Sequence, residues 1–198
     1  MVYSLKTGSL EGKFENIHKD LIDACRQGDR AAQFKLYKLY YKAMFNTSLR
    51  IVNDTAEAED IMQESFLDAF RMLDSYTSQG SFGSWLKRIV VNNSLDSLRR
   101  AKETLPLDEG LNIADQTEDN LEAEINFQVG QVKKAIQQLP DEYRVIISLF
   151  LLEGYDHEEI SEILNISNQL SRTRYSRARQ KLLAILKENQ YRNAFIYN

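Results

Sequence analysis

The 198-residue sequence contains one cysteine, two prolines, eight glycines and two histidines. A single cysteine excludes an internal disulfide and is consistent with a reducing compartment. So few prolines and glycines leave long helical periodicities uninterrupted, which predicts an all-α protein. The histidines, His18 and His157, lie in different parts of the chain. With the lone cysteine they do not predict a zinc site, although carboxylates could supply other ligands.

Long hydrophobic runs and catalytic motifs are also missing. The longest apolar run, residues 145–152, contains Ser148 and is too short to cross a bilayer. The N-terminus has no apolar signal core, so we expect no membrane insertion and a cytoplasmic location. No glycine-rich phosphate loop or nucleophile motif occurs, so we expect no catalytic residue, no cofactor and no metal. An enzyme is therefore the least supported class.

Charge is segregated along the chain, although the net charge is only −4. Residues 82–102 hold five Lys or Arg against one acid, and residues 169–187 hold six Lys or Arg and no acid. Between them, residues 103–124 hold eight acids and no Lys or Arg. The two basic stretches favour nucleic-acid binding, whereas the acidic stretch has poor helical periodicity and predicts a flexible linker.

The acidic stretch is also the best domain boundary. We predict two small helical domains, 14–102 and 125–187, joined by the acidic flexible linker 103–124. The expected helices before the linker span about 16–27, 30–52, 54–74 and 82–102, and those after it span about 121–139 and 140–154, followed by a helix-turn-helix.

Residues 155–183 carry the helix-turn-helix signature. Asp156 and Glu159 form a capping-box pair that starts the first short helix. Asn165 can take the left-handed conformation that ends a helix, and Ser167 can cap the next one. The second helix of such a motif enters the DNA major groove, so the C-terminal domain is predicted to bind DNA.

At about 100° per residue, this second helix has two distinct faces. The stripe expected to be buried consists of Ser171, Tyr175, Ala178 and Leu182. The opposite face carries donors and acceptors suited to base edges and phosphates, and these predicted DNA contacts are Gln169, Arg172, Thr173, Ser176 and Arg177. A solvated basic face on an ordinary surface helix is the alternative.

Two polar groups in the N-terminal domain also stand out. Asp60, Gln63 and Glu64 are spaced by three and four residues, so they share one face of the helix predicted over 54–74. A solvated helix face has the same pattern. Tyr76 precedes a helix that carries the remaining candidates, which are Asn92, Arg99 and Arg100. Aromatic side chains beside a basic helix suit unstacked bases.

Three stretches together resemble a known family: AEDIMQESFLDAF (58–70), SFGSWLKRIVVNNSLDSLRR (81–100), and LPDEYRVIISLFLLEGYDHEEISEILNIS (139–167) with SRAR (176–179). The chain resembles the bacterial RNA polymerase sigma factors, and most closely the two-domain extracytoplasmic-function (ECF) group. The resemblance covers most of residues 15–187. It implies a non-catalytic factor that directs core RNA polymerase to a subset of promoters and helps to open them.

The resemblance also implies partners and residue roles. Asp60, Gln63 and Glu64 would dock on the clamp coiled coil of the polymerase β′ subunit, and the β flap would be a further contact. Tyr76 and Asn92 would hold a base flipped from the minus-ten element, with Arg99 and Arg100 on the adjoining duplex. The helix-turn-helix would read the minus-thirty-five element of promoter DNA. The linker would thread the RNA-exit path, and an anti-sigma factor is a further expected partner.

The chain departs from the family pattern at two places. Gln169, Leu170 and Ser171 stand where the family often has Gly or Ser followed by Thr and Val, and Val91 stands where a basic residue is frequent. Promoter preference is therefore not predicted. The principal alternative is a stand-alone helix-turn-helix regulator, which would bind a palindrome as a dimer and need no polymerase-facing patch.

Overall fold

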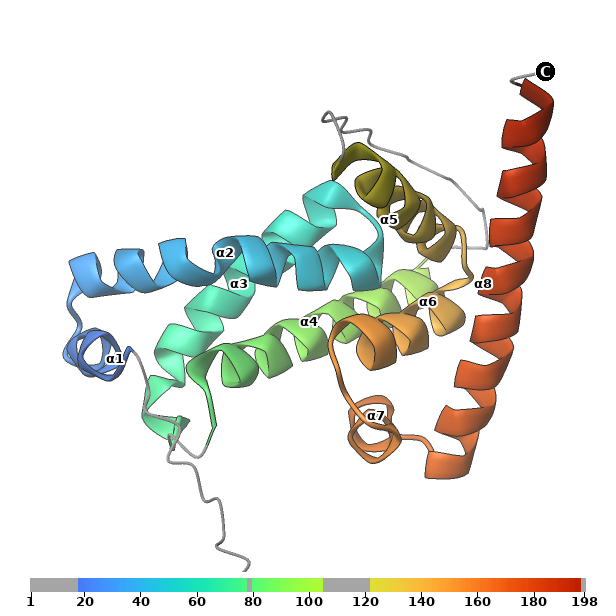
Figure 1. Cartoon of the computed structure of the whole chain (residues 1–198). Helices are drawn as coiled ribbons and strands as arrows, with labels where there is room; N and C mark the ends of the chain where they lie inside the picture. Colours follow the sequence, from blue (N-terminus) through green and yellow to red (C-terminus); the bar gives the residue numbers. More distant parts are fainter. Residues whose placement is uncertain (1–17, 78–79, 105–121, 197–198) are drawn as a thin grey trace, which may run out of the picture.

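The computed structural model describes residues 18–77, 80–104 and 122–196, with side chains described over 18–77, 80–102 and 129–189. Within these ranges every regular element is a helix (Figure 1). The elements are α1 (Lys19–Arg26), α2 (Arg30–Val52), α3 (Thr55–Arg71), a 3-10 turn η1 (Leu73–Ser75), α4 (Phe82–Thr104), α5 (Glu122–Gln137), α6 (Asp141–Ile147), a π-helical segment η2 (Ser148–Leu152), α7 (His157–Leu164) and α8 (Asn168–Ile196).

The predicted acidic linker lies mostly outside the described residues. Its two ends continue the neighbouring helices, because α4 runs to Thr104 and α5 begins at Glu122. The helix predicted over 30–52 has the predicted bounds. The side chain of Asp29 accepts hydrogen bonds from the first backbone N–H groups of α2 (2.8 and 3.2 Å), and Asn53 ends the helix in the left-handed conformation, with φ 61°.

The start of α3 is only half of a capping box. Asp54 accepts a hydrogen bond from the backbone N–H of Glu57 at 2.8 Å. The Glu57 carboxylate instead accepts a hydrogen bond from the hydroxyl of Ser97 on α4. A tertiary contact has therefore replaced the local one, and it ties the first turn of α3 to α4.

The first four helices enclose one buried cluster. Helices α2, α3 and α4 pack against one another, and α1 packs against α2 (Figure 1). Apolar side chains at helical spacing on α2, α3 and α4 supply most of this cluster. The largest fully buried members of the cluster are Ile22, Leu36, Phe82, Leu86 and Val90.

In the C-terminal half, α5, α6 and α7 pack against α8. This helix runs along one side of the molecule, where α5, α6 and α7 contact it in turn (Figure 1). It is longer than the predicted recognition helix and continues through the C-terminal tail to Ile196. Between α6 and α7 the backbone widens into the π-helical segment η2 before Gly154, whose φ of +80° turns the chain.

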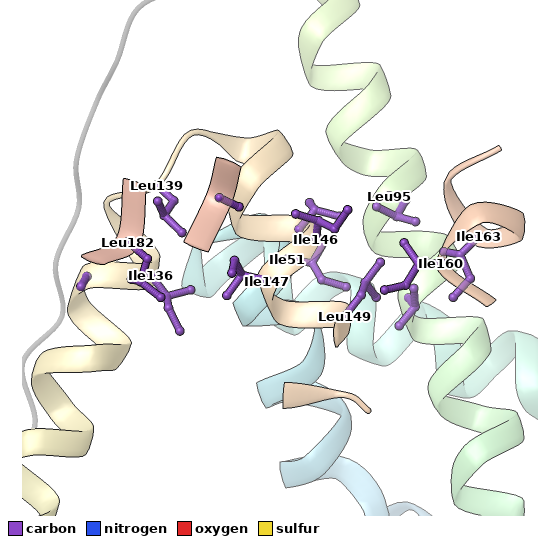
Figure 2. Close-up of a cluster of buried hydrophobic side chains, with 14 residues drawn as sticks. Ile51, Leu95, Ile136, Leu139, Ile146, Ile147, Leu149, Ile160, Ile163 and Leu182 are labelled. Carbon is purple, nitrogen blue, oxygen red and sulfur yellow. The ribbon is translucent and has the colours of Figure 1, made fainter. Parts of the chain in front are cut away.

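A second buried cluster is shared between the two halves of the chain. It contains Ile51 of α2 together with Val91 and Leu95 of α4, packed with apolar side chains of α5 to α8. Figure 2 shows Ile51 beside Ile146 and Ile147, while Leu95 lies toward α7. The C-terminal helices therefore complete their core against the surface of the N-terminal bundle.

Candidate nucleic-acid interface

The predicted helix-turn-helix forms as expected. The Asp156 carboxylate accepts hydrogen bonds from the backbone N–H groups two and three residues later (2.8 and 2.9 Å). The Glu159 carboxylate accepts one from the Asp156 N–H (2.9 Å), which completes the capping box. Asn165 ends α7 in the left-handed conformation, with φ 51°. The Ser167 hydroxyl accepts a hydrogen bond from the N–H three residues later (3.2 Å) and starts α8.

The two faces of α8 separate as their periodicity predicts. Ser171 and Ala178 are fully buried, Leu182 is buried and Tyr175 is half-buried. The exposed residues on the opposite face include Gln169, Arg172, Thr173, Ser176 and Arg177. Arg172 Nε donates to Asn168 Oδ1 at 2.8 Å, and the Thr173 hydroxyl donates to the Gln169 carbonyl at 2.9 Å. A polar face on a helix held firmly from behind suits rigid insertion into a major groove.

His157 fixes the base of α8 against α7. Its ring stacks on Phe150 with 4.7 Å between centroids, and its Nδ1 shares a 2.9 Å hydrogen bond with the Ser171 hydroxyl. Burial, helped by the positive charge of Arg172, lowers the pKa of His157, whereas the Asp156 carboxylate acts in the opposite direction. At neutral pH the ring is uncharged, so it acts here as a packing group.

The exposed end of α4 brings two predicted sites together. Arg99 is exposed and forms an ion pair with Asp96 at 2.7 Å, and Arg100 is exposed beside it. Both arginines line a shallow depression together with Glu64 of α3. The predicted polymerase-docking face therefore borders the predicted minus-ten duplex contacts. Asn92 lies about two turns before these arginines and is exposed on α4.

Tyr76 is buried, with 3% of its surface exposed. Its hydroxyl donates to the Gly80 carbonyl at 2.7 Å, and its ring meets Phe82 edge-on at 5.6 Å. Arg26 Nη2 donates to the Tyr76 carbonyl at 2.7 Å and anchors the start of the loop. Trp85 is half-buried at 5.4 Å from the Tyr76 ring. In this conformation Tyr76 supports the loop and does not present a free stacking face.

A groove runs beside this loop between the two halves of the chain. The N-terminal half lines it with residues that include Tyr76, Thr77, Ser84, Trp85, Lys87 and Arg88. The C-terminal half contributes Glu153, Gly154, Tyr155 and Glu159. Asn92 is not among the described residues that line the groove.

The predicted docking face on α3 is accessible. Asp60, Gln63 and Glu64 are all exposed, and Gln63 Nε2 donates to Glu59 Oε1 at 3.4 Å. The opposite face of α3 is buried in the N-terminal bundle through Ile61, Met62, Ser65 and Phe66. The three polar side chains are therefore available to a partner.

Sequence reasoning missed the residues that join the two halves. Glu153 pairs with Arg50 and Lys87, and the buried Arg144 donates hydrogen bonds to the end of α2. The partners are far apart in sequence, so no local pattern could have paired them. The available signals were a lone acid just before Gly154 and a lone arginine, Arg144, just before the apolar run 145–152.

In the described part of the chain, no three or more His, Cys, Asp or Glu side chains gather where they could hold a metal ion. No helix in that part is long and apolar enough to cross a membrane. Cys25 is buried in the N-terminal bundle, and burial together with the charge of Asp29 raises the pKa of its thiol.

Comparisons with known proteins agree with this geometry. Residues 36–104 match Sigma-70 region 2, and residues 130–182 match Sigma-70 region 4. The chain is 30% identical over 177 residues to the ECF RNA polymerase sigma factor SigM of Mycobacterium tuberculosis, covering 88% of this chain and 87% of SigM. It is 31% identical over 185 residues to the ECF RNA polymerase sigma factor SigW of Bacillus subtilis, covering 88% of this chain and 99% of SigW.

Solved structures share the fold. CnrH, solved in complex with the cytosolic domain of CnrY, has a TM-score of 0.53 at 21% identity, covering 86% of this chain and 97% of CnrH. The sigma factor RpoE of Bartonella quintana, solved with the anti-sigma factor NepR, has a TM-score of 0.55 at 21% identity, covering 77% of this chain and 95% of that chain.

The two matched regions and the full-length relatives define the class: the chain belongs to the ECF RNA polymerase sigma factors. It is a sigma factor that directs promoter-specific transcription initiation, with region 2 in its N-terminal helices and region 4 in its helix-turn-helix half. This membership sets aside the stand-alone regulator that the sequence had left as the alternative.

Proposed function

We propose that residues 14–102 act as region 2, which docks on core polymerase and recognises and melts the minus-ten element, and that residues 125–187 act as region 4, which reads the minus-thirty-five element. Residues 103–124 join them. The observation that carries the proposal is the exposed polar face of α8 opposite its fully buried stripe. That face offers arginine, amide and hydroxyl groups, which are the groups that read base edges and bind phosphates in the major groove.

The residues on this face are Gln169, Arg172, Thr173, Ser176 and Arg177. Because Thr173 already donates its hydroxyl proton to the backbone, it serves as an acceptor or as an apolar methyl contact. Arg172 and Arg177 carry the long, charged groups of the set. They are the best candidates for bidentate recognition of guanine or for phosphate contact.

The polymerase-facing surface is the exposed row Asp60, Gln63 and Glu64 on α3, which would meet the clamp coiled coil of β′. Arg99 and Arg100 border this row and would contact duplex DNA beside the minus-ten element. Asn92 would receive an extruded base from the exposed side of α4. Tyr76 would reach that base only if the loop after it rearranges, because the ring is buried in the present conformation.

The factor acts without catalysis of its own, in the cytoplasm, on promoter DNA and core polymerase, including its β flap. An anti-sigma factor is a further proposed partner. A structural relative supports this proposal, since RpoE of Bartonella quintana was solved with the anti-sigma factor NepR.

The proposal is tested by reconstituting the protein with core polymerase and measuring run-off transcription from native genomic DNA. On promoters found in this way, Arg172→Ala and Arg177→Ala should each reduce transcription. A base-reading arginine should cost about 1–3 kcal/mol, or roughly 5- to 150-fold, and relax the preference at one position. A uniform loss across all sequences would indicate phosphate contact.

Lys181→Ala is the matched control. Lys181 is an exposed base on the same helix, and it lies nine residues beyond Arg172, roughly 13 Å further along the axis. Its loss should leave the order of promoter preference unchanged. Full activity of both arginine variants, or no promoter-dependent product from the wild type, would contradict the proposal.

A further inference from the structure

One exposed side chain at the start of α8 is apolar. Leu170 has 37% of its surface exposed and belongs to neither of the buried clusters formed by the described residues. It is the third residue of α8, which begins at Asn168. In a helix-turn-helix, the N-terminal residues of the second helix are the ones that contact base edges. Leu170 therefore lies at the end of α8 where DNA recognition is concentrated, and its side chain has no donor with which to bind a phosphate.

The backbone around Leu170 is held firmly. Its N–H donates to the Ser167 hydroxyl, which caps the helix, at 3.2 Å. The next residue, Ser171, is fully buried, and its hydroxyl shares a 2.9 Å hydrogen bond with His157 Nδ1. Because Ser171 points into the core, the helical period turns the side chain of Leu170 about 100° away from it. Rotating α8 to bury Leu170 would break the contacts of Ser171.

Leu170 shares its side of α8 with two of the proposed DNA contacts. At about 100° per residue, it lies about 20° from Arg177 and about 60° from Thr173 around the helix axis. Both of these residues are exposed. The Thr173 hydroxyl already donates to the Gln169 carbonyl at 2.9 Å, so Thr173 brings no free donor to this side. When this side of α8 enters the major groove, a leucine enters with it.

An apolar side chain in the major groove has one favourable partner among the bases. Thymine carries a 5-methyl group there, cytosine presents an amine, and the purines present N7 beside a carbonyl oxygen or an amine. Against a polar edge, leucine displaces water from donors or acceptors and returns no hydrogen bond, which is unfavourable. Against the thymine methyl group, it buries apolar surface of both partners. Leucine at this position therefore favours thymine over the other bases.

We propose that Leu170 is a specificity-determining residue that reads a thymine of the minus-thirty-five element through the 5-methyl group. This role rests on the proposed function of α8 and adds to it the identity of one base. Loss of the methyl contact corresponds to about 0.8 kcal/mol, which is roughly a fourfold loss of affinity. The methyl group can be removed from the DNA without changing any hydrogen-bonding group of the base pair, so its contribution can be measured by itself.

The first experiment removes that methyl group. In a promoter found by run-off transcription, each thymine of the minus-thirty-five element is replaced in turn by deoxyuridine, on either strand. Binding of the polymerase holoenzyme is measured by competition against the unmodified duplex. With the wild-type factor, replacement of at least one thymine should weaken binding roughly fourfold.

Variants of Leu170 connect the methyl group to this side chain. Leu170→Ala should bind the thymine and deoxyuridine forms of that position equally, because alanine no longer reaches the methyl group. Leu170→Met keeps an apolar side chain of similar length and should retain most of the difference. Circular dichroism should show the same helicity for both variants and the wild type.

Leu183→Ala is the matched control. Leu183 is a leucine of the same helix with 48% of its surface exposed, and it lies 13 residues beyond Leu170, roughly 20 Å further along the axis. Its side chain is too far along α8 to meet the same base. Leu183→Ala should therefore keep the roughly fourfold difference between thymine and deoxyuridine.

The second experiment restores the methyl group on a different base. Cytosine paired with guanine is placed at the sensitive position, which should weaken binding of the wild-type holoenzyme. 5-Methylcytosine at the same position should recover part of that loss, because its methyl group lies on the same edge of the major groove. Leu170→Ala should bind the cytosine and 5-methylcytosine duplexes equally.

Two results would overturn the role of Leu170 alone. One is promoter-dependent transcription by the wild type with no deoxyuridine-sensitive thymine in the minus-thirty-five element. The other is a sensitive thymine whose difference persists in Leu170→Ala, because another side chain would then read the methyl group. Both results would leave the proposed function standing, whereas a wild type that yields no promoter-dependent product would contradict the proposed function and the role of Leu170 together.

Discussion

The buried guanidinium of Arg144 allows the sharpest stability prediction. Its side chain is 5% exposed and serves two backbone carbonyls: Ile51, at 3.0 and 3.2 Å, and Leu139, at 3.3 Å. It also forms a 2.8 Å ion pair with Asp141. The Ile51 carbonyl lies in the last turn of α2, where no intrahelical N–H can reach it. The substitution Arg144→Met keeps the apolar stem and removes every donor.

The cost follows from the groups left behind. Two buried carbonyls lose their donor, at about 1–3 kcal/mol each. Asp141 is 38% exposed, so water replaces most of what it loses and its share is about 0–1 kcal/mol. Together these shares give an expected loss in the free energy of unfolding of about 2–7 kcal/mol. The stability of Arg144→Lys should lie between that of the wild type and that of Arg144→Met. One ammonium group lacks the planar fork of donors with which the guanidinium serves both carbonyls.

The assay is urea unfolding at 25 °C, followed by far-ultraviolet circular dichroism. Because one buried cluster spans both halves, the wild type should unfold in a single transition. Arg71→Met is the control: its pair with Asp68 at 3.1 Å has the same spacing, but Arg71 is 72% exposed. The control should change stability by no more than about 0.5 kcal/mol. An Arg144→Met loss below about 1 kcal/mol, or one equal to that of the control, would refute the reasoning.

Three other predictions address the interfaces. Asp60→Ala with Glu64→Ala should weaken assembly with core polymerase in a binding titration while helicity stays unchanged, and wild-type affinity would remove the docking assignment. Asn92→Ala should impair the opening of duplex promoters, detected with permanganate, more than it impairs binding to core polymerase. A template pre-melted across the minus-ten region should recover part of the defect, because its bases are already unpaired. A loss explained entirely by weaker core binding would return Asn92 to a structural role. The pKa of His157 is lowered in the folded state, so the unfolded chain takes up the proton first as the pH falls. The stability that this ring contributes is therefore present above about pH 6.5 and is lost as the pH falls below that value. His157→Gln should therefore lose less stability than the wild type between pH 7.5 and 5.5, and an equal loss in both proteins would contradict this origin.

Local chemistry explains why the sequence predicted the helix-turn-helix so closely. The Asp156 capping box, the left-handed Asn165 and the Ser167 cap are contacts between residues at most three apart, so their geometry follows from the backbone alone. The two faces of α8 follow from the helical period in the same way. The ECF resemblance was also carried by the sequence and is confirmed by the full-length relatives. The individual DNA and polymerase contacts stay predictions.

Tertiary structure decided the features that depend on partners far along the chain. The Glu57 carboxylate accepts a hydrogen bond from the Ser97 hydroxyl on α4 instead of completing the capping box of α3, and the Tyr76 ring packs in the aromatic cluster beside Phe82. Val91 became part of the second buried cluster, which both halves of the chain share.

Glu153 gives the clearest case of this difference. It pairs with residues 66 and 103 positions away, and no spacing along a helix encodes such a pair. The sequence determined which segments are helical and which faces are apolar, because backbone hydrogen bonding and helical period act over a few residues. It did not determine which apolar faces meet, because that choice depends on the combined shape and charge of both halves. Only the packing of the two halves brings the buried Glu153 carboxylate into contact with Arg50, Lys87 and Thr47.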